Sequence, residues 1–523
     1  MNTISNPILK GFQPDPSILR VEDDYYIATS TFEWFPGVQI HHSRDLVNWR
    51  LLTSPLNRKS QLDMLGNPNS GGVWAPCLSY NNGTFYLIYT DVKSRKGAYK
   101  DTHNYLVMAE QITGPWSEPI YLNSSGFDPS LFHDEDGRQW LVNMLWDFRK
   151  GNNSFAGIVL QEYSAEQEKL IGPISNIFKG TELKLTEAPH LYKQNGFYYL
   201  ITAEGGTQYN HAVTVCRSKS IEGPYEVDPE NPVLTSAGNS ELVLQKAGHG
   251  SLVETQNGIW YLAHLCGRPV KEIYCNLGRE TAIQRCFWNE EGWLRIEGGG
   301  NIPSVEVSSP GLEAHPFIPE SNKDDFEGSE LKVYWSTLRI QPDPNWISLQ
   351  ERPGHLRLKG MESPSSLHQQ SMVARRQTSF HCEAETVVEF EPVHFQQMAG
   401  LILYYDTEDY IYLRITHDEE WGKCLGIIQS INGEYNELLE QEVPLQGIKR
   451  CGLKAVIELE WLQFWYRLDE QNWLKLGPTI DICHLSDDAA DYIRFTGTFI
   501  GMCAHDLSGS RLHADFDYFI YTD

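Results

Sequence analysis

Residues 127–144 read FDPSLFHDEDGRQWLVNM. An Asp-Pro start precedes a short apolar run, the polar turn EDG follows, and a second run rich in aromatic and β-branched residues completes the stretch. A turn that ends in glycine between two such runs is a strong sequence signal for a β-hairpin. The stretch therefore predicts two antiparallel strands.

Four other stretches repeat this unit loosely. They are QPDPSILRVEDDYYIATS at 13–30, WAPCLSYNNGTFYLIYT at 74–90, TEAPHLYKQNGFYYLIT at 186–202 and GHGSLVETQNGIWYLAHL at 248–265. The matched positions 15, 75, 128, 187 and 249 are separated by 60, 53, 59 and 62 residues. That spacing is longer than the ~40–50 residues of a usual propeller blade, which leaves room for long loops. No helical apolar period persists through the region. We predict a five-bladed β-propeller over residues 1–302.

The pattern changes after the last repeat. Residues 303–324 contain prolines at 303, 310, 316 and 319, which is typical of a stiff linker. Alternating runs such as HLRLKG, AGLILYYD and KAVIELEWLQFWYRL follow, without the propeller period. Many strands joined by polar turns favour an antiparallel β-sandwich, which we predict for residues 325–523. The predicted class is therefore all-β.

Composition narrows the range of partners. The 523 residues include 42 Lys and Arg against 69 Asp and Glu, a formal charge of −27, which repels phosphate backbones and anionic lipid headgroups. Nucleic acid and membrane are therefore not expected as partners. The start MNTISNPILKGF lacks the basic and apolar parts of a signal peptide, and no two of the ten cysteines form a C-x-x-C pair. We expect a cytoplasmic protein with reduced thiols.

Aligned repeats place equivalent residues of different blades around one central depression. Those residues are Asp15, Ala75, Asp128, Glu187 and His249. One Asp-Pro pair is common turn chemistry, but three acids at matched positions are harder to explain by structure alone. Aromatic residues make up 12% of the chain, more than a sheet core requires, and aromatic rings stack on the apolar faces of sugars. Carboxylates in such a depression predict hydrolysis of a glycosidic bond.

The chain resembles the glycoside hydrolase family 43 β-xylosidases through a combination of six stretches: FQPDPSI, GGVWAPCL, FDPSLFHDEDGR, LTEAPHLY, AGHGSLVET and LGRETAIQ. The similarity extends to FTGTFIGMCAHDL and ADFDYF near the C-terminus. The resemblance implies a five-bladed propeller that carries the active site and a β-sandwich that completes its pocket. It also implies release of xylose from the non-reducing ends of β-1,4-xylo-oligosaccharides, with inversion if the base activates water.

The resemblance implies a role for each acid. Asp15 would be the general base and Glu187 the general acid, while Asp128 would raise the pKa of the acid and orient it. The substrate-binding residues implied in the same way are Phe32, Trp74, Trp146, Thr207, Arg279 and a phenylalanine of the sandwich, either Phe495 or Phe499.

The resemblance implies less about metal use and oligomeric state. In some members the histidine that matches His249 lies close to a bound calcium or other divalent ion, although a lone histidine is more often a satisfied internal residue. We expect no required cofactor. The resemblance is also compatible with a homo-oligomer.

Three alternatives differ from the main hypothesis. An α-L-arabinofuranosidase can use the same site, because arabinofuranose and xylopyranose present similar hydroxyls. A fructan or sucrose hydrolase is disfavoured, since the chain lacks an N-D-P-N-G start and an R-D-P element. A carbohydrate-binding propeller without activity is disfavoured, because all three acids are present.

Overall fold

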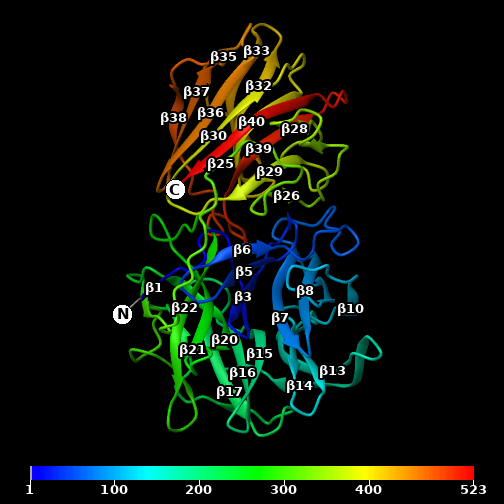
Figure 1. The fold of residues 1–523 in the computed structure, drawn as a ribbon, viewed down its shortest axis with the longest axis vertical. Helices are drawn as coiled ribbons and strands as arrows, with labels where there is room; N and C mark the ends of the chain where they lie inside the picture. Colours follow the sequence, from blue (N-terminus) through cyan, green and yellow to red (C-terminus); the bar gives the residue numbers. More distant parts are fainter. Residues whose placement is uncertain (1–2) are drawn as a thin grey trace.

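The computed structural model describes residues 3–523, and the first two residues of the predicted propeller lie outside this range. All regular secondary structure in the described part is β-strand. Figure 1 shows two parts, with the strands of residues up to about 300 below and the later strands above. The predicted all-β class is confirmed.

Five antiparallel sheets form the lower part. Within each sheet neighbouring strands follow one another in chain order, except that the fifth strand of the fourth sheet pairs with its third. The first strands of the five sheets contact one another in a closed ring, so they lie around a central axis. The predicted five-bladed propeller is confirmed. Its strands are β2 (Ser17–Val21), β3 (Asp24–Thr29), β5 (Gln39–Ser43) and β6 (Arg50–Thr53); β7 (Gly72–Asn81), β8 (Thr84–Ser94), β9 (Asp101–Ala109) and β10 (Ile120–Asn123); β11 (Ser130–His133), β12 (Gln139–Trp146), β13 (Phe155–Ser164) and β14 (Lys169–Phe178); β15 (Glu187–Gln194), β16 (Phe197–Glu204), β17 (Ala212–Ser218), β18 (Glu226–Val227) and β19 (Leu234–Thr235); β20 (Gln245–Glu254), β21 (Trp260–Gly267), β22 (Arg279–Trp288) and β23 (Leu294–Ile296).

Side chains of the inner strands hold neighbouring blades together. The Ser17 hydroxyl accepts the Leu78 N–H at 3.0 Å, and the Ser251 hydroxyl accepts the Ile18 N–H at 3.1 Å. The second of these bonds joins the first blade to the last. Because each bond satisfies a buried backbone donor, it also removes the cost of leaving that donor unpaired.

The segments before and after the propeller pack against it. Strand β1 (Thr3–Ser5) pairs with β24 (Glu306–Ser308), which lies within the segment predicted as a linker. Further along this segment, the His315 N–H donates to Asp45 at 2.8 Å. Strand β25 (Lys323–Asp324) pairs with β40 (His513–Thr522) of the upper part. Residues 303–324 therefore make specific contacts with both parts.

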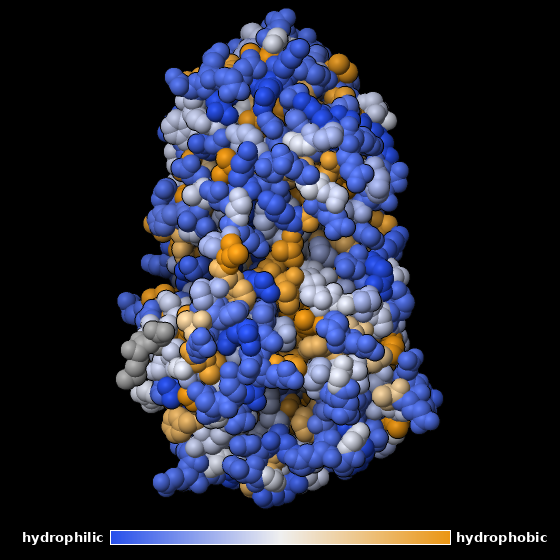
Figure 2. All heavy atoms as spheres, viewed as in Figure 1, coloured by the Kyte–Doolittle hydropathy of each residue, from blue (hydrophilic) through white to orange (hydrophobic). Residues whose placement is uncertain are grey.

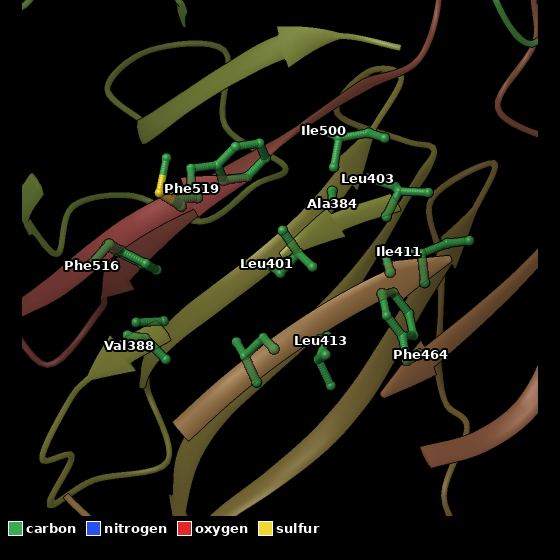
Figure 3. Packing of buried hydrophobic residues seen from close by; sticks show 14 of the residues in the cluster. Ala384, Val388, Leu401, Leu403, Ile411, Leu413, Phe464, Ile500, Phe516 and Phe519 are labelled. Carbon is green, nitrogen blue, oxygen red and sulfur yellow. The ribbon is translucent and has the colours of Figure 1, made fainter. Parts of the chain in front are cut away.

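Two antiparallel sheets face each other in the upper part, as predicted for a sandwich. Apolar side chains of both sheets meet in the middle, among them Leu401 and Ile411 from one sheet and Phe464 and Phe516 from the other (Figure 3). The first sheet contains β27 (Ile347–Ser348), β28 (Leu356–Lys359), β40, β30 (His381–Glu389), β36 (Arg450–Glu458), β37 (Trp461–Leu468), β38 (Leu474–Asp481) and β25; the second contains β34 (Glu434–Glu437), β33 (Gly422–Ile431), β32 (Tyr410–Asp418), β31 (Gln397–Tyr404), β39 (Phe499–Asp506), β29 (Ser371–Arg376), β26 (Ser336–Leu338), β4 (Trp34–Phe35) and β35 (Val443–Pro444).

Strand β4 belongs to the propeller by sequence and to the sandwich by pairing. Phe35 pairs with Thr337 and Trp34 with Leu338, so β4 extends the second sandwich sheet. The Trp34 ring stacks on Phe499 with centroids 3.7 Å apart, and both side chains are fully buried. The two parts therefore share a hydrophobic core.

The outer surface is mostly hydrophilic in the view of Figure 2, with a few hydrophobic side chains exposed near mid-height. The described residues include no helix with the length and apolar character that a membrane crossing would need. All ten cysteines are buried and unpaired.

Candidate active site

A cavity of about 570 Å³ opens at the propeller axis beneath the sandwich. Its acidic residues belong to the start of three inner strands: Asp15 precedes β2, Asp128 precedes β11, and Glu187 begins β15. All ten residues predicted to form the site line this cavity: Asp15, Phe32, Trp74, Asp128, Trp146, Glu187, Thr207, His249, Arg279 and Phe495.

The backbone around the axis adopts an unusual conformation in every blade. Asp15, Ala75, Asp128, Ala188 and His249 have φ values of 56, 33, 54, 50 and 50 degrees. For residues other than glycine, this left-handed conformation costs on the order of 1 kcal/mol each. Such strain at five equivalent positions is expected where side chains are aimed at a functional site.

The left-handed residues correct the alignment of the fourth repeat by one position. Ala188, directly before Pro189, is the equivalent of Asp15 and Asp128, which also precede prolines. Glu187 is one residue earlier, at the position that Phe127 occupies in the third repeat. The three acids therefore reach one cavity from two different repeat positions.

Asp15 is held by a chain of hydrogen bonds and by two basic groups. The Ser30 hydroxyl donates to its Oδ2 at 2.6 Å, and the Ala75 N–H donates to Ser30 at 2.8 Å. The Arg279 guanidinium lies 3.3 Å and His249 Nδ1 3.6 Å from Oδ1. Burial alone would raise the pKa of Asp15, but Arg279, His249 and the Ser30 hydrogen bond together lower this pKa below its usual value.

The pKa values of the other two carboxyl groups are shifted in the opposite direction, above their usual values. Burial, followed by repulsion from Asp15, raises the pKa of Asp128 to about 8, although the Ala188 N–H donates to its Oδ2 at 3.2 Å. Burial, followed by repulsion from Asp128 and Asp15, raises the pKa of Glu187 well above its usual value. At neutral pH the cavity therefore holds an ionised Asp15 and a protonated Glu187.

Arg279 connects the acids to both parts of the molecule. Its Nη1 donates to the Thr207 hydroxyl at 2.9 Å, and its Nη2 donates to the Phe495 carbonyl at 3.2 Å. The guanidinium also lies over the rings of Phe32 and Phe495, at 5.4 and 5.3 Å from their centroids. The side chain is 3% exposed, and its Nε has no hydrogen-bond partner among the described residues.

Aromatic rings line the cavity in two groups. The inner group contains Phe32, Trp74 and Phe495, with Phe495 5.7 Å from Phe32 and 5.3 Å from Trp74. The outer group contains Trp146 and Phe155, both partly exposed, with centroids 5.6 Å apart. The sequence left Phe495 and Phe499 as alternatives. Phe495 lines the cavity, whereas Phe499 is buried beneath it against Trp34.

His249 provides a limited set of metal ligands. Asp15 is the one carboxylate within 4 Å of it in the part of the chain that the structure describes. Burial lowers the pKa of His249, so the ring is neutral at pH 7. The one group of three donors that could jointly hold an ion among residues 3–523 is Cys275, Asp487 and Asp488, which does not include His249. These neighbours do not form a protein cage for a divalent ion at His249.

Sequence reasoning missed several residues of the cavity wall. They come from the segment after β8, from the loops before β11 and β15, from β13 and from the sandwich, and they are Arg95, Lys96, Lys100, Phe127, Phe155, Leu185, Tyr492 and Ile493. Phe127 directly precedes Asp128, so its repeat position could have identified it. The basic residues lie outside the repeated unit, and no pattern marked them.

The comparisons with known proteins agree with this geometry. Residues 4–294 match the family described as Glycosyl hydrolases family 43, and residues 323–522 match the Beta xylosidase C-terminal Concanavalin A-like domain. A crystal structure of xylan beta-1,4-xylosidase from Bacillus halodurans C-125 is 65% identical, with a TM-score of 0.99 over 99% of this chain and 100% of that chain.

Two curated relatives are similar over nearly their whole length. The Beta-xylosidase of Bacillus subtilis (strain 168) is 53% identical over 99% of both chains. The Xylosidase/arabinosidase 43B of Humicola insolens is 50% identical over 100% of this chain and 98% of its own. With the family match over residues 4–294, these similarities show that the chain is a glycosidase that belongs to glycoside hydrolase family 43.

Proposed function

We propose that this protein is an exo-acting β-xylosidase, which releases xylose from the non-reducing ends of β-1,4-xylo-oligosaccharides such as xylobiose. The observation that carries the proposal is the buried acid cluster, in which the pKa of Asp15 is lowered while that of Glu187 is raised. Glycoside hydrolysis needs one ionised and one protonated carboxyl group in the same site. The names of the similar enzymes indicate xylose as the sugar, and the acid cluster indicates hydrolysis as the reaction.

Glu187 acts in this proposal as the general acid. Its raised pKa keeps the carboxyl protonated at neutral pH, ready to donate to the oxygen of the departing sugar. The ionised Asp15 repels a charge on Glu187, and Asp128 adds to this effect because a charge on either of these two buried acids disfavours a charge on the other. The proton leaves Glu187 as the glycosidic C–O bond breaks.

Asp15 acts as the general base. Its lowered pKa keeps it ionised, so it can accept a proton from a water that attacks the anomeric carbon on the opposite face. Ser30 and Arg279 fix the orientation of the carboxylate. Because water attacks directly, the configuration at the anomeric carbon is inverted.

The inner aromatic group supports exo action. Phe495 comes from the sandwich, and its ring lies against Phe32 and Trp74 of the propeller. A terminal sugar would be enclosed there, between these rings and Arg279. The partly exposed Trp146 and Phe155 would then contact the departing part of the oligosaccharide.

A side activity on α-L-arabinofuranosides is a second candidate. The printed name of the Humicola insolens relative includes arabinosidase, and arabinofuranose presents hydroxyls similar to those of xylopyranose. The same three acids would serve both substrates.

An activity screen tests the proposal. We expect hydrolysis of xylobiose and p-nitrophenyl β-xyloside, with slower hydrolysis of p-nitrophenyl α-L-arabinofuranoside. Addition of a chelator should leave kcat/KM unchanged, because the Arg279 guanidinium, 3.3 Å from Asp15, already compensates the charge of this carboxylate. Binding of xylobiose without turnover would contradict the proposal. Faster turnover of the arabinoside than of the xyloside would make α-L-arabinofuranosidase the main activity and β-xylosidase the side activity.

A further inference from the structure

Three basic side chains of one short segment line the outer part of the cavity. Arg95, Lys96 and Lys100 follow β8, and we call them the basic rim. In the part of the chain that the structure describes, none of the three has a carboxylate oxygen within 4.0 Å, whereas the neighbouring Lys93 pairs with Asp91 at 2.7 Å. An unpaired group of cations is unexpected in a chain with a net charge of −27.

The basic rim lies over aromatic side chains that line the cavity. Lys100 Nζ is 4.5 Å from the centroid of Trp146, Arg95 is 4.8 Å from that of Phe495, and Lys96 Nζ is 5.2 Å from that of Tyr492. In the proposed function, Trp146 contacts the departing part of the substrate. Lys100 therefore lies on the leaving-group side of the cavity, and Arg95 and Lys96 belong to the same short segment beside it.

Structural roles account for part of this arrangement. Arg95 donates to the backbone carbonyls of Asn69 and Ile493, and Lys100 donates to the carbonyl of Arg95 at 2.8 Å. Lys96 is exposed and has no hydrogen-bond partner among the described residues. Lys96 and two of the three Lys100 donors are therefore free for a ligand.

Acidic residues lie near the rim, but among the described residues none forms an ion pair with it. The buried Glu33 and Asp406 attract Arg95 and oppose the lowering of its pKa by burial, and the Tyr492 hydroxyl donates to Glu408. Burial and then repulsion from Arg95 lower the pKa of Lys100. The charged residue that acts on Lys100 is therefore another cation. A neutral xylo-oligosaccharide offers no charge that would use this field, whereas a carboxylate would.

We propose that the basic rim binds a carboxylate on the leaving-group side of the substrate, so that acidic xylo-oligosaccharides are substrates of this enzyme. The inference rests on the proposed β-xylosidase function. Two sources share the required chemistry: an aldonic acid at the reducing end of the leaving unit, and a uronic acid attached to that unit as a branch.

Two matched pairs of substrates test the proposal. Xylobionate and xylobiitol differ only in a carboxylate that replaces a hydroxymethyl group, and glucuronosyl-xylobiose substituted on the leaving unit is compared with xylobiose. At low ionic strength we expect kcat/KM for at least one acid to exceed that of its neutral partner by about threefold or more. The ratio should fall towards one in about 0.5 M salt, where charges are screened within a few ångströms. The pair that responds identifies the source.

Charge-removing variants locate the effect. Lys96→Met should lower the acid-to-neutral ratio at low salt, and Lys96→Met combined with Lys100→Met should remove it. Lys475→Met, an exposed lysine on β38 of the sandwich, is the matched control and should keep the wild-type ratio. Ratios of one or less for both pairs at low salt, or ratios that survive in Lys96→Met and the double variant, would overturn the proposal. Turnover of neutral xylobiose tests the β-xylosidase function separately.

Discussion

Glu187 and Asp15 share one cavity, yet their surroundings shift their pKa values in opposite directions. Asp15 has Arg279 and His249 as neighbours, and Glu187 has buried surroundings and other acids. Glu187→Gln should reduce kcat/KM for xylobiose by about 10²–10⁴-fold, because proton donation is lost. An aryl xyloside needs little help from an acid and should lose about tenfold or less. Steady-state kinetics on both substrates provide the test. Asp15→Asn, as the comparison, should impair both alike, and equal losses in Glu187→Gln would argue against its role as acid.

The same residues determine the pH dependence. An acid whose pKa is lowered stays ionised further into the acidic range, so activity should fall only below the usual pKa of Asp15. A raised pKa keeps Glu187 and Asp128 protonated to higher pH, so the alkaline limb should lie near or above pH 8. The two limbs belong to the coupled acids together. A pH profile of kcat/KM for xylobiose measures both, and an alkaline limb near ~4.3, the ordinary pKa of Glu, would contradict this assignment.

At the scale of elements, two phenylalanines near the start of β39 have different environments. Phe495 lies in the cavity wall, and Phe499 is fully buried against Trp34. Phe495→Ala should lower kcat/KM for xylobiose about tenfold, which corresponds to ~1.4 kcal/mol of lost transition-state contact. Phe499→Ala should instead lower the free energy of unfolding by about 3–5 kcal/mol. Kinetics and urea denaturation of both variants separate these effects, and unchanged kinetics in folded Phe495→Ala would remove its role in the pocket.

The elements also show why sequence reasoning reached some features and not others. The blades were predictable, because each hairpin carries its own polar turn, with a glycine in four of the five, and its own strand pattern. The alignment of Glu187 was one residue off, because the acid precedes Ala188 rather than Pro189 in that repeat. Strand β4 has two residues, and its pairing with β26 depends on contacts about 300 residues away, which no local pattern encodes. The basic rim was missed for the same reason, since it meets Tyr492 and Phe495 only after folding.

At the scale of the whole molecule, buried ion pairs join the propeller to the sandwich. Lys246 is fully buried, and its Nζ lies 3.2 Å from Asp487 and 2.8 Å from Asp488. Lys246→Met would leave two buried acids without their cation, so we expect the free energy of unfolding to fall by about 3–5 kcal/mol.

An exposed ion pair across the same interface supplies the control. Lys271 pairs with Asp481, and both side chains are more than one third exposed. Lys271→Met should therefore cost no more than ~1 kcal/mol. Urea denaturation at neutral pH measures both variants. Equal stability of the two would mean that the buried pair does not hold the parts together.

The central claim, that Asp15 activates water while Glu187 donates a proton, concerns the product of the whole assembled site. Proton NMR of p-nitrophenyl β-xyloside hydrolysis, recorded before mutarotation, identifies the anomer that is released first. Direct attack by water predicts α-xylose as the initial product, because inverting enzymes use a single displacement. Initial β-xylose would contradict the account, since it would require Asp15 or another carboxylate to form a covalent intermediate.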